Sequence, residues 1–224
     1  MGTNYNTKIV TSGLVLCLDA ANSKSYPGSG TNWTDLSGVG LNGTLAGGTS
    51  FSTSNGGIIN FDGVNGKVTF PNITIDTSNG IAVDIWFKTS SSSKYQDIFD
   101  MADSYGVWLV TNYSTDGPGK IGASFNTATG RMLVSYSADT WYHIVLTGSG
   151  TSNYVYVNGV QANTSAQTVQ TSVNFNTARL GQVDGDRASE YLVGNIAACK
   201  FYNRILSAVE VSQNFNALRG RFGI

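Results

Sequence analysis

The clearest pattern along the chain is the alternation of apolar and polar side chains between residues 81 and 88. The odd positions are apolar, whereas Asp84 and Lys88 fall on the other side. Successive side chains of a β-strand point to opposite faces, so this pattern predicts a strand with one face turned towards a core.

Similar runs of β-branched and aromatic residues, bounded by Gly, Asn, Asp and Ser, recur along the whole chain. They predict strands near residues 8–10, 14–18, 57–61, 67–70, 81–89, 96–101, 106–111, 120–126, 131–136, 141–147, 153–157, 178–183 and 191–202. This rhythm is typical of an all-β sandwich.

Local turn and capping signals fix two further elements. Asn158-Gly159 separates the runs 154–157 and 160–162, and this dipeptide accepts positive φ at both central positions of a hairpin turn. Near the end of the chain, Ser207 and Glu210 have the spacing of a capping box and predict the start of a helix. Its apolar face would carry Val211, Phe215 and Leu218.

Residues 22–56 lack a regular pattern and are rich in Gly, Ser, Thr and Asn around Trp33 and Leu36. We expect a long ordered loop there. No linker and no repeat of fixed period interrupts the chain. The sequence therefore predicts an N-terminal arm over residues 1–12 and a single domain over residues 13–224.

Charge is scarce, which narrows the classes of partner. Charged residues make up 12% of the chain, and 13 basic against 14 acidic residues give a net charge of −1. No basic run is present that would neutralise a row of phosphates, so we expect no nucleic-acid binding. No apolar stretch reaches the ~20 residues that cross a bilayer, and the first twelve residues do not resemble a signal peptide.

The residues needed for catalysis are also scarce. Glu190 and Glu210 are the two glutamates, and no Glu-x-Asp-x-Glu strand signature of the β-sandwich glucanases occurs. His143 is the single histidine, and it lies within a strand pattern. We expect His143 to be structural and the protein not to be an enzyme.

Two cysteines, Cys17 and Cys199, lie in apolar runs near opposite ends of the chain. They are too few for a disulfide framework or a four-ligand zinc site. We expect buried free thiols, and a single bridge is the alternative if their two strands are neighbours.

Several motifs together resemble laminin-G-like domains of the concanavalin A-like lectin/glucanase superfamily. They occupy residues 13–22, 33–38, 42–45, 61–63, 141–143, 156–159, 180–181, 194–197, 201–207 and 210–211. The resemblance covers residues 13 to about 220. It implies a jelly-roll sandwich of two antiparallel sheets with one short C-terminal helix, in which the first and last strands pair and bring Cys17 and Cys199 into one region.

Some members of that family bind calcium at the rim of the sandwich, so calcium is a candidate cofactor. Asp184 and Asp186 lie in a predicted loop and would supply two carboxylates to one ion, although an exposed turn is the alternative. Asp62 is the third candidate. The segment after it, residues 64–67, replaces the acidic residues of relatives with neutral residues and a lysine.

Sugar binding uses an aromatic ring that stacks on the C–H face of the sugar, with polar groups beside it. Aromatic residues in or beside loop-like polar segments are the candidates, and each has a role as a buried loop anchor as its alternative: Trp33, Tyr26, Tyr95, Tyr105 and Tyr113. Trp86, Trp108 and Trp141 lie within strand patterns and are expected in the core.

The opening Leu-Asp-Ala-Ala-Asn and the closing Asn-Phe-Asn-Ala-Leu-Arg-Gly-Arg-Phe-Gly resemble domains in structural proteins of tailed phages. This resemblance implies a non-enzymatic protein of the virion surface, such as a capsid decoration or a head or tail fibre module. Its partners would be other virion proteins, cell-surface glycans and further copies of the chain. The alternatives are a soluble calcium-dependent lectin and a degenerate glycoside hydrolase.

Overall fold

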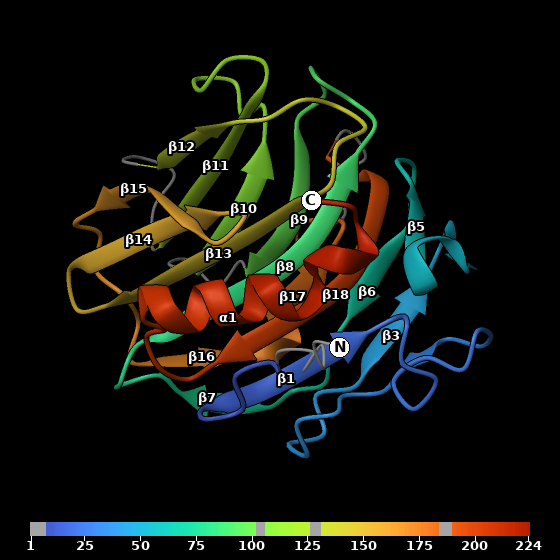
Figure 1. Cartoon of the computed structure of the whole chain (residues 1–224), viewed down its shortest axis with the longest axis horizontal. Coiled ribbons are helices and arrows are strands. Elements are labelled where there is room, and N and C mark those ends of the chain that lie inside the picture. The colour runs from blue at the N-terminus through green and yellow to red at the C-terminus, as the bar shows by residue number, and fades with distance from the viewer. Residues whose placement is uncertain (1–7, 102–105, 126–130, 184–189) are drawn as a thin grey trace, which may run out of the picture.

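The computed structural model describes residues 8–101, 106–125, 131–183 and 190–224. Two large antiparallel sheets dominate it (Figure 1). Sheet A runs in the order β15 (Val160–Ser165), β14 (Ser152–Val157), β13 (Tyr142–Ser149), β8 (Ile81–Thr89), β18 (Val193–Tyr202), β5 (Ile58–Asp62) and β4 (Thr49–Ser52), and β1 (Leu14–Asp19) also pairs with β18.

Sheet B is the second layer of the sandwich. Its order is β12 (Met132–Ser135), β11 (Lys120–Phe125), β10 (Val107–Thr111), β9 (Gln96–Met101), β17 (Ala178–Leu180), β6 (Lys67–Thr69), β3 (Gly43–Ala46) and β2 (Asn32–Trp33). A small third sheet pairs β7 (Thr74–Asp76) with β16 (Ser172–Asn174). The all-β jelly-roll sandwich expected from the sequence is confirmed.

The core lies between the inner faces of the two sheets. Alternate residues of β8, namely Ile81, Val83, Ile85 and Phe87, are buried there, as their spacing predicted. Residues of sheet B such as Phe99 meet them from the other side. Asp84 and Trp86 point away from this core, which leaves an outer face of sheet A that needs a cover.

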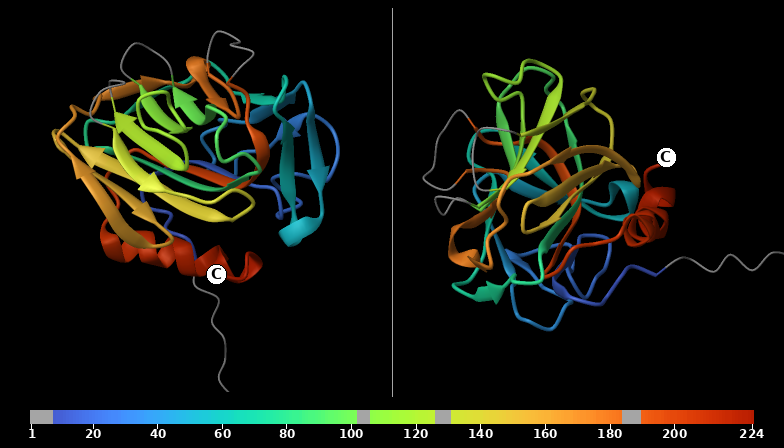
Figure 2. Two further views of the ribbon diagram at one scale, coloured as in Figure 1. Left: turned by 90° about the horizontal axis from the view of Figure 1, so that it is seen from above. Right: turned by 90° about the vertical axis from the view of Figure 1, so that its left-hand side faces the viewer.

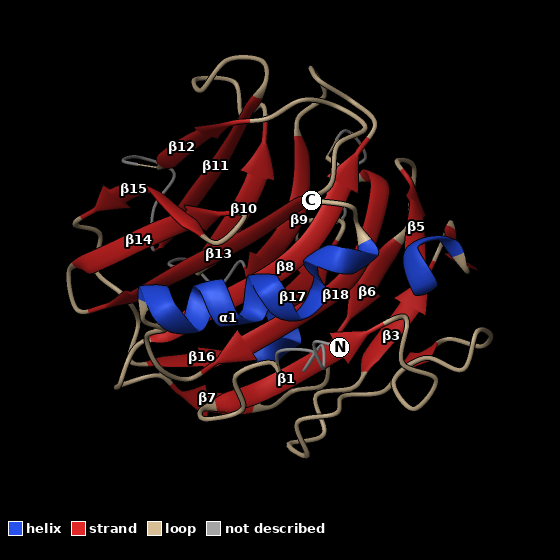
Figure 3. Ribbon diagram, viewed as in Figure 1, coloured by secondary structure: helices blue, strands red, loops and turns tan. Residues whose placement is uncertain are grey.

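Helix α1 (Ala208–Leu218) supplies that cover (Figures 1 and 3). Ser207 caps its first turn, and Glu210 completes the predicted capping box. The views from above and from the side show α1 on one layer of the sandwich only (Figure 2). The outer face of sheet B carries no helix of the described residues. Shorter 3-10 helices span Ser54–Gly56, Phe175–Thr177 and Arg219–Arg221.

The predicted hairpin is confirmed. β14 and β15 pair across Asn158 and Gly159, whose φ angles are 50° and 81°. Positive φ at both central positions matches the right-handed twist of the two strands. The phenyl ring of Phe215 also lies against Gly159, where an added Cβ would meet it at 3.0 Å.

Two expectations about elements were wrong, and two strands were missed. Residues 8–10 form no strand, although Val10 is buried and its amide donates to Asn214 Oδ1 of α1 at 2.7 Å. The loop expected over residues 22–56 contains β2, β3 and β4. β7 and β16 were not expected. These strands have between two and four residues, which is too short for an alternating pattern to identify them.

The two cysteines lie on neighbouring strands, because β1 pairs with β18 as the family resemblance implied. Cys17 lies opposite Lys200, and Cys199 lies opposite Leu18. Their side chains therefore point to opposite faces of sheet A, and both are buried free thiols. Burial is the main cause that raises the pKa of Cys17, to about 11.

Within the described ranges, no helix combines the length and the apolar character needed to cross a membrane.

Candidate functional site

A row of polar and aromatic side chains crosses the outer face of sheet B. Strand pairing places Thr69 opposite Arg179, Arg179 opposite Asp100, Asp100 opposite Trp108, and Trp108 opposite Ser124. Directly paired residues of antiparallel strands share a face. Four strands besides β6 thus contribute to one continuous row, with the half-buried Trp108 near its centre.

A β-bulge in β9 brings a second carboxylate to this face. Leu109 pairs with Phe99, but Val110 pairs with Asp97, so Ile98 is the additional residue. Ile98 and Phe99 both point into the core. Asp97 and Asp100 therefore both point outwards, although residues three apart in a regular strand would face opposite sides.

Tyr95 and Tyr113 lie at the end of β9 and β10 and extend the row. Their ring centroids are 5.2 Å apart at an interplanar angle of 85°. The guanidinium carbon of Arg131 lies 3.9 Å from the centroid of Tyr113. Arg131 also donates two hydrogen bonds to Asp116, at 2.8 and 2.7 Å. This contact covers one face of Tyr113, so Tyr95 and Trp108 are the rings better placed to stack on a ligand.

A glycine in β11 makes room for the Arg131–Asp116 pair. A Cβ at Gly122 would lie 2.7 Å from Asp116 Oδ2 and 2.8 Å from Arg131 Cδ. The ion pair therefore lies flat on the strand, with side chains only 4% and 6% exposed. A bidentate pair held in this way is rigid and keeps the Tyr113 ring in place.

The Tyr95 hydroxyl interacts electrostatically with three carboxylates. Burial raises the pKa of Tyr95, and Asp97, Glu190 and Asp100 raise it further because a phenolate would meet their negative charge. Asp97, Asp100 and Glu190 are all buried, and each has partners within the fold. Glu190 also belongs to this group through its backbone, since its carbonyl accepts a hydrogen bond from the Asp97 amide at 2.9 Å.

Among the described residues, the hydroxyl of Ser124 has no hydrogen-bond partner, although Ser124 is only 1% exposed. Its position opposite Trp108 places it on the outer face, beside the indole. A buried hydroxyl without a partner costs free energy, and such groups are commonly satisfied by a ligand or an ordered water. This hydroxyl marks the row as a place where a polar ligand group fits.

The five aromatic residues predicted to contact a ligand lie in different surroundings. Trp33 is fully buried, and Tyr26 is 4% exposed with its hydroxyl donating to Gly30 O at 2.7 Å. Both are loop anchors without a ring face for a ligand. Tyr105 lies outside the described residues. Tyr95 and Tyr113 are half-buried and lie together at the row on sheet B.

Trp108 was expected in the core, but it lies on the outer face of sheet B. Val107 and Leu109 do point inwards, and Trp108 between them points outwards. Strict alternation through this segment would have indicated that a tryptophan lies on the outer face. Trp86 and Trp141 are buried as expected.

Of the three predicted metal ligands, the described structure contains Asp62. Asp184 and Asp186 lie outside the described residues. Asp62 accepts backbone hydrogen bonds from Val64, Asn65 and Gly66 through Oδ1, at 2.9 to 3.0 Å. Burial alone would raise the pKa of Asp62, but these backbone hydrogen bonds together outweigh it and lower the pKa. Asp62 thus caps a turn and is a poor calcium ligand.

The described residues contain no group of three or more His, Cys, Asp and Glu side chains arranged to hold a metal ion. His143 is fully buried beneath α1 and stacks on Trp86 at a centroid distance of 4.9 Å. It lies 3.2 Å from Asp84. A catalytic role at a surface cleft is inconsistent with this burial.

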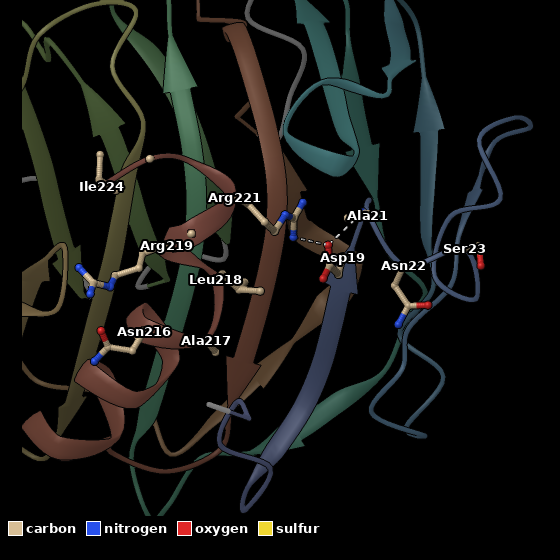
Figure 4. A pocket seen from close by; sticks show the side chains of 12 residues that line it. Asp19, Ala21, Asn22, Ser23, Asn216, Ala217, Leu218, Arg219, Arg221 and Ile224 are labelled. Carbon is tan, nitrogen blue, oxygen red and sulfur yellow. Dashed lines mark hydrogen bonds and ion pairs between the residues drawn. The ribbon is translucent and has the colours of Figure 1, made fainter. Parts of the chain in front are cut away.

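A hollow lies away from the row on sheet B, between the C-terminal end of α1 and the turn after β1 (Figure 4). Its volume is about 930 Å³, and it is open to solvent. Arg221 crosses its floor and bonds Asp19 at 2.8 Å, Asn55 O at 3.0 Å and Gly57 O at 3.0 Å. These bonds tie the C-terminal segment to the sandwich. No aromatic ring lines the hollow, so it offers no stacking platform.

Fold and site together define a lectin-like β-sandwich with an aromatic and carboxylate-rich outer face. The profile of the concanavalin A-like lectin/glucanases superfamily matches residues 62–212, and the chain belongs to this superfamily. A comparison with curated protein sequences found no match.

Solved structures share the fold at low sequence identity. A Trypanosoma rangeli sialidase in complex with sialic acid aligns with a TM-score of 0.70 and 17% identity over 93% of this chain, which spans 33% of the sialidase chain. Domain 4 of the arabinanase AbnA from Geobacillus stearothermophilus, in complex with arabinotriose, gives 0.70 and 17%, over 91% of this chain and 98% of that domain.

The ligand-binding domain of botulinum neurotoxin serotype D, in complex with N-acetylneuraminic acid, aligns with a TM-score of 0.68 and 14% identity. It covers 92% of this chain and 51% of the other. At these identities the similarity establishes the fold, and the ligand has to be argued from the residues of this chain.

Proposed function

We propose that the protein is a non-catalytic glycan-binding module and that the outer face of sheet B is its binding surface. The observation that carries the proposal is the row in which the half-buried Trp108 lies between Asp100 and the unpartnered hydroxyl of Ser124. An indole stacks on the C–H face of a sugar, while neighbouring carboxylate and hydroxyl groups bond its hydroxyls. The sugar complexes of the arabinanase and neurotoxin domains support this proposal at the level of the fold.

The proposal is tested by a glycan array followed by calorimetry on the purified chain. We expect a reproducible saccharide ligand whose affinity falls at least tenfold, about 1.4 kcal/mol, in Trp108→Ala. The matched control is Tyr154→Ala, which removes a half-buried aromatic side chain from sheet A. Equal affinity of wild type and Trp108→Ala would contradict the assignment of the surface, and an array without any signal would contradict the function.

Glycoside hydrolysis is a second candidate, because Asp97, Asp100 and Glu190 place several carboxylates on one face and glycosidases use a pair. Their burial disfavours catalysis, because Asp100 is 0% exposed and Asp97 is 2% exposed. A general acid has to reach the glycosidic oxygen. We therefore expect no new reducing ends when the array ligand is incubated with the protein. Turnover that disappears in Asp100→Asn would establish an enzyme instead.

We further propose that the module acts on a virion surface, as an attachment or decoration subunit. The support for this placement is the similarity of the two end segments to domains of phage structural proteins. Mass spectrometry of purified particles from the source is the test, with stoichiometric incorporation expected. Absence from the particles would leave the alternative of a soluble lectin.

Calcium dependence is a separate proposal, carried by Asp184 and Asp186 alone, since Asp62 is committed to its turn. The rings and hydroxyl of the sheet B row need no metal to bind a sugar. Calorimetric titration with calcium chloride tests the point. Heat of binding that is lost in Asp184→Asn would support a calcium site, and a flat titration would contradict it.

A further inference from the structure

We propose that the ligand of the sheet B surface is an oligosaccharide that lies along β10, with one sugar unit on Trp108 and another on Tyr95. This inference rests on the proposed function and adds the size and the direction of the ligand. Its basis is the position of the two rings on the outer face of sheet B and the set of contacts that holds Tyr95 in place.

Tyr95 lies on the same face of the sheet as Trp108, towards the other end of the strand pair β9–β10. Tyr95 directly precedes β9 and is two residues away from the outward-pointing Asp97, so alternation places both side chains on one side. Gln96, which follows Tyr95, pairs with Thr111 of β10. Trp108 and Tyr95 therefore mark the two ends of one strip of the outer face, which we call the β10 strip.

The backbone positions of the two rings are too far apart for one sugar unit. Trp108 and Thr111 are three residues apart, which is about 10 Å along a strand, and Tyr95 lies one residue beyond the pair that Thr111 forms. A single sugar ring does not span this distance, whereas a short oligosaccharide does. Because the separation follows β10, a ligand that contacts both rings runs along this strand.

Exposed ring surface lies at the two ends of the β10 strip. Val110 is the outward-facing residue of β10 between the rings, and it is fully buried. Val110 pairs with Gly122 of β11, over which Arg131 and Asp116 lie with side chains only 4% and 6% exposed. Trp108, by contrast, is half-buried, as are Tyr95 and Tyr113 at the other end. Stacking is thus offered at two separate places, which suits a ligand with more than one sugar.

The backbone at Tyr95 is fixed by its neighbour Lys94. Lys94 Nζ donates to Gly63 O at 2.7 Å and to Tyr191 O at 2.8 Å. The Lys94 carbonyl accepts a hydrogen bond from Asn112 Nδ2 at 2.9 Å. These bonds tie the start of β9 to the turn after β5, to the segment before β18 and to the end of β10. The Tyr95 ring is therefore carried by a rigid part of the fold.

Arg131 fixes the Tyr95 ring indirectly, through Tyr113. Its guanidinium carbon lies 3.9 Å from the centroid of Tyr113, and the Tyr113 centroid lies 5.2 Å from that of Tyr95. Arg131 is itself held by two hydrogen bonds to Asp116 and by one from Nη2 to Thr115 Oγ1 at 3.0 Å. A ring that is ordered before binding loses less conformational entropy when a ligand stacks on it. Arg131 is thus a positioning residue for the Tyr95 end of the strip.

The first test varies the length of the ligand on the wild-type chain. The glycan array carries cello-, xylo-, chito- and arabino-oligosaccharides, each from the monosaccharide to the hexasaccharide, and calorimetry follows the series that binds best. We expect the affinity to rise at least tenfold between the monosaccharide and the longest members, because the second ring is reached only by a longer chain. Equal affinity for the monosaccharide and the hexasaccharide would overturn the inference and leave glycan binding intact. An array without any signal would overturn both.

The second test removes the ring at the far end of the strip. Tyr95→Leu keeps an apolar side chain of moderate size, and we expect it to weaken binding of the hexasaccharide at least tenfold while the affinity for the shortest ligand that binds changes less than twofold. Trp108→Ala should weaken binding of both ligands. The matched control is Tyr154→Ala on sheet A, which should change neither. Thermal unfolding verifies that each variant is folded.

The third test concerns Arg131. Arg131→Lys keeps the positive charge but loses the bidentate bond to Asp116 and the flat contact with Tyr113. We expect it to reduce the dependence of affinity on ligand length in the same direction as Tyr95→Leu and to a smaller extent. A general structural defect would weaken binding of short and long ligands alike. Equal losses for all lengths in folded Tyr95→Leu would therefore contradict a sugar subsite at Tyr95, and the same result in Arg131→Lys would contradict the positioning role.

Discussion

On the outer face of sheet A, Asp84 lies beneath α1, and Lys200 Nζ is 2.9 Å from its Oδ1. On the outer face of sheet B, by contrast, Asp100 lies beside the half-buried Trp108, and no described helix covers it. Both carboxylates are fully buried. On sheet A the network around Asp84 is closed, since Asn214 Nδ2 donates to Asp84 Oδ2 at 2.8 Å and to Tyr202 Oη at 2.9 Å. The indole N–H of the nearby Trp86 has no hydrogen-bond partner among the described residues.

The comparison separates a structural polar cluster from a binding surface. Under α1 the main hydroxyl and carboxylate groups have partners in the fold, and aromatic rings cover them: Phe215 and Phe222 stack on Trp86 at 5.7 and 4.3 Å. On sheet B, Trp108 is part-exposed and the Ser124 hydroxyl has no partner. Buried polar groups that are satisfied stabilise a fold, while an unsatisfied group beside an exposed ring favours a ligand.

The largest effect is expected from breaking the ion pair under α1. Lys200→Met leaves Asp84 charged and buried without its cation, so we expect the free energy of unfolding to fall by about 3–5 kcal/mol. The measurement is chemical denaturation. The control is the double variant Asp84→Asn with Lys200→Met, which removes both charges and is expected to lose less. A loss below about 1 kcal/mol in the single variant would contradict the closed network.

Acid should act on the same cluster. Burial alone would raise the pKa of Asp84, but Lys200 and His143 outweigh it and hold this pKa well below its ordinary value. Arg204 and, to a smaller extent, Ser207 lower the pKa of Glu210 to about 2, against burial. Depressed native pKa values contribute stability above the unfolded pKa of about 4, and this stability is lost as the pH falls below it.

We therefore expect the free energy of unfolding to decrease steadily from about pH 4 towards pH 2. Denaturation curves at pH 6, 4, 3 and 2 give the slope. The double variant Asp84→Asn with Lys200→Met should show a shallower decline because one of the two carboxylates is gone. A decline of equal steepness in both proteins would assign the acid sensitivity to other groups.

The next largest loss of stability is expected from removing an aromatic ring of α1 that covers sheet A. Phe215 stacks on Trp86 and on His143, each at a centroid distance of 5.7 Å. Phe215→Ala should cost about 2–3 kcal/mol, since the ring is half-buried and leaves a cavity. Val209→Ala on the same helix is the control, because Val209 is 77% exposed, and it should stay within about 0.5 kcal/mol. Similar losses in both variants would contradict the packing of α1 on this face.

The smallest effect on the free energy of unfolding is expected from removing one of two buried hydroxyls, and comparing the two is the most discriminating test. Thr147 Oγ1 donates to Ile81 O and accepts from the Leu206 amide, both at 3.0 Å, so Thr147→Val should cost about 1–3 kcal/mol. Ser124→Ala removes a hydroxyl without a partner and should change stability by less than about 0.5 kcal/mol while weakening glycan binding. A large loss of stability in Ser124→Ala would show that the hydroxyl has a structural role.

Much of the sandwich was predictable because the local sequence pattern identifies its long strands. The alternation in β8, the Asn158-Gly159 turn and the capping box at Ser207 each identify an element within a few residues. β3 and β4 were not predictable in this way, because they are short and exist through pairing with β6 and β5. Such pairing depends on residues distant in the sequence.

The candidate site was less predictable for a related reason. Tyr95 and Tyr113 were candidates for contacting a ligand, but nothing local showed that they lie against each other. The bulge at Ile98 decides that Asp97 and Asp100 share a face, and the segment 107–111 is apolar on both faces, which concealed the outward position of Trp108. A register irregularity is a property of the paired sheet and leaves no mark in the sequence of one strand.

The central claim is that glycans bind to the outer face of sheet B. The chain has four tryptophans, and Trp33, Trp86 and Trp141 are buried, so the indole N–H signals in a ¹H–¹⁵N spectrum report on separate places. Titration with the glycan found on the array, with Trp108→Phe to assign the signal, tests the claim most directly. We predict that the Trp108 indole shifts and the other three stay in place. A static Trp108 signal during saturable binding would contradict the account.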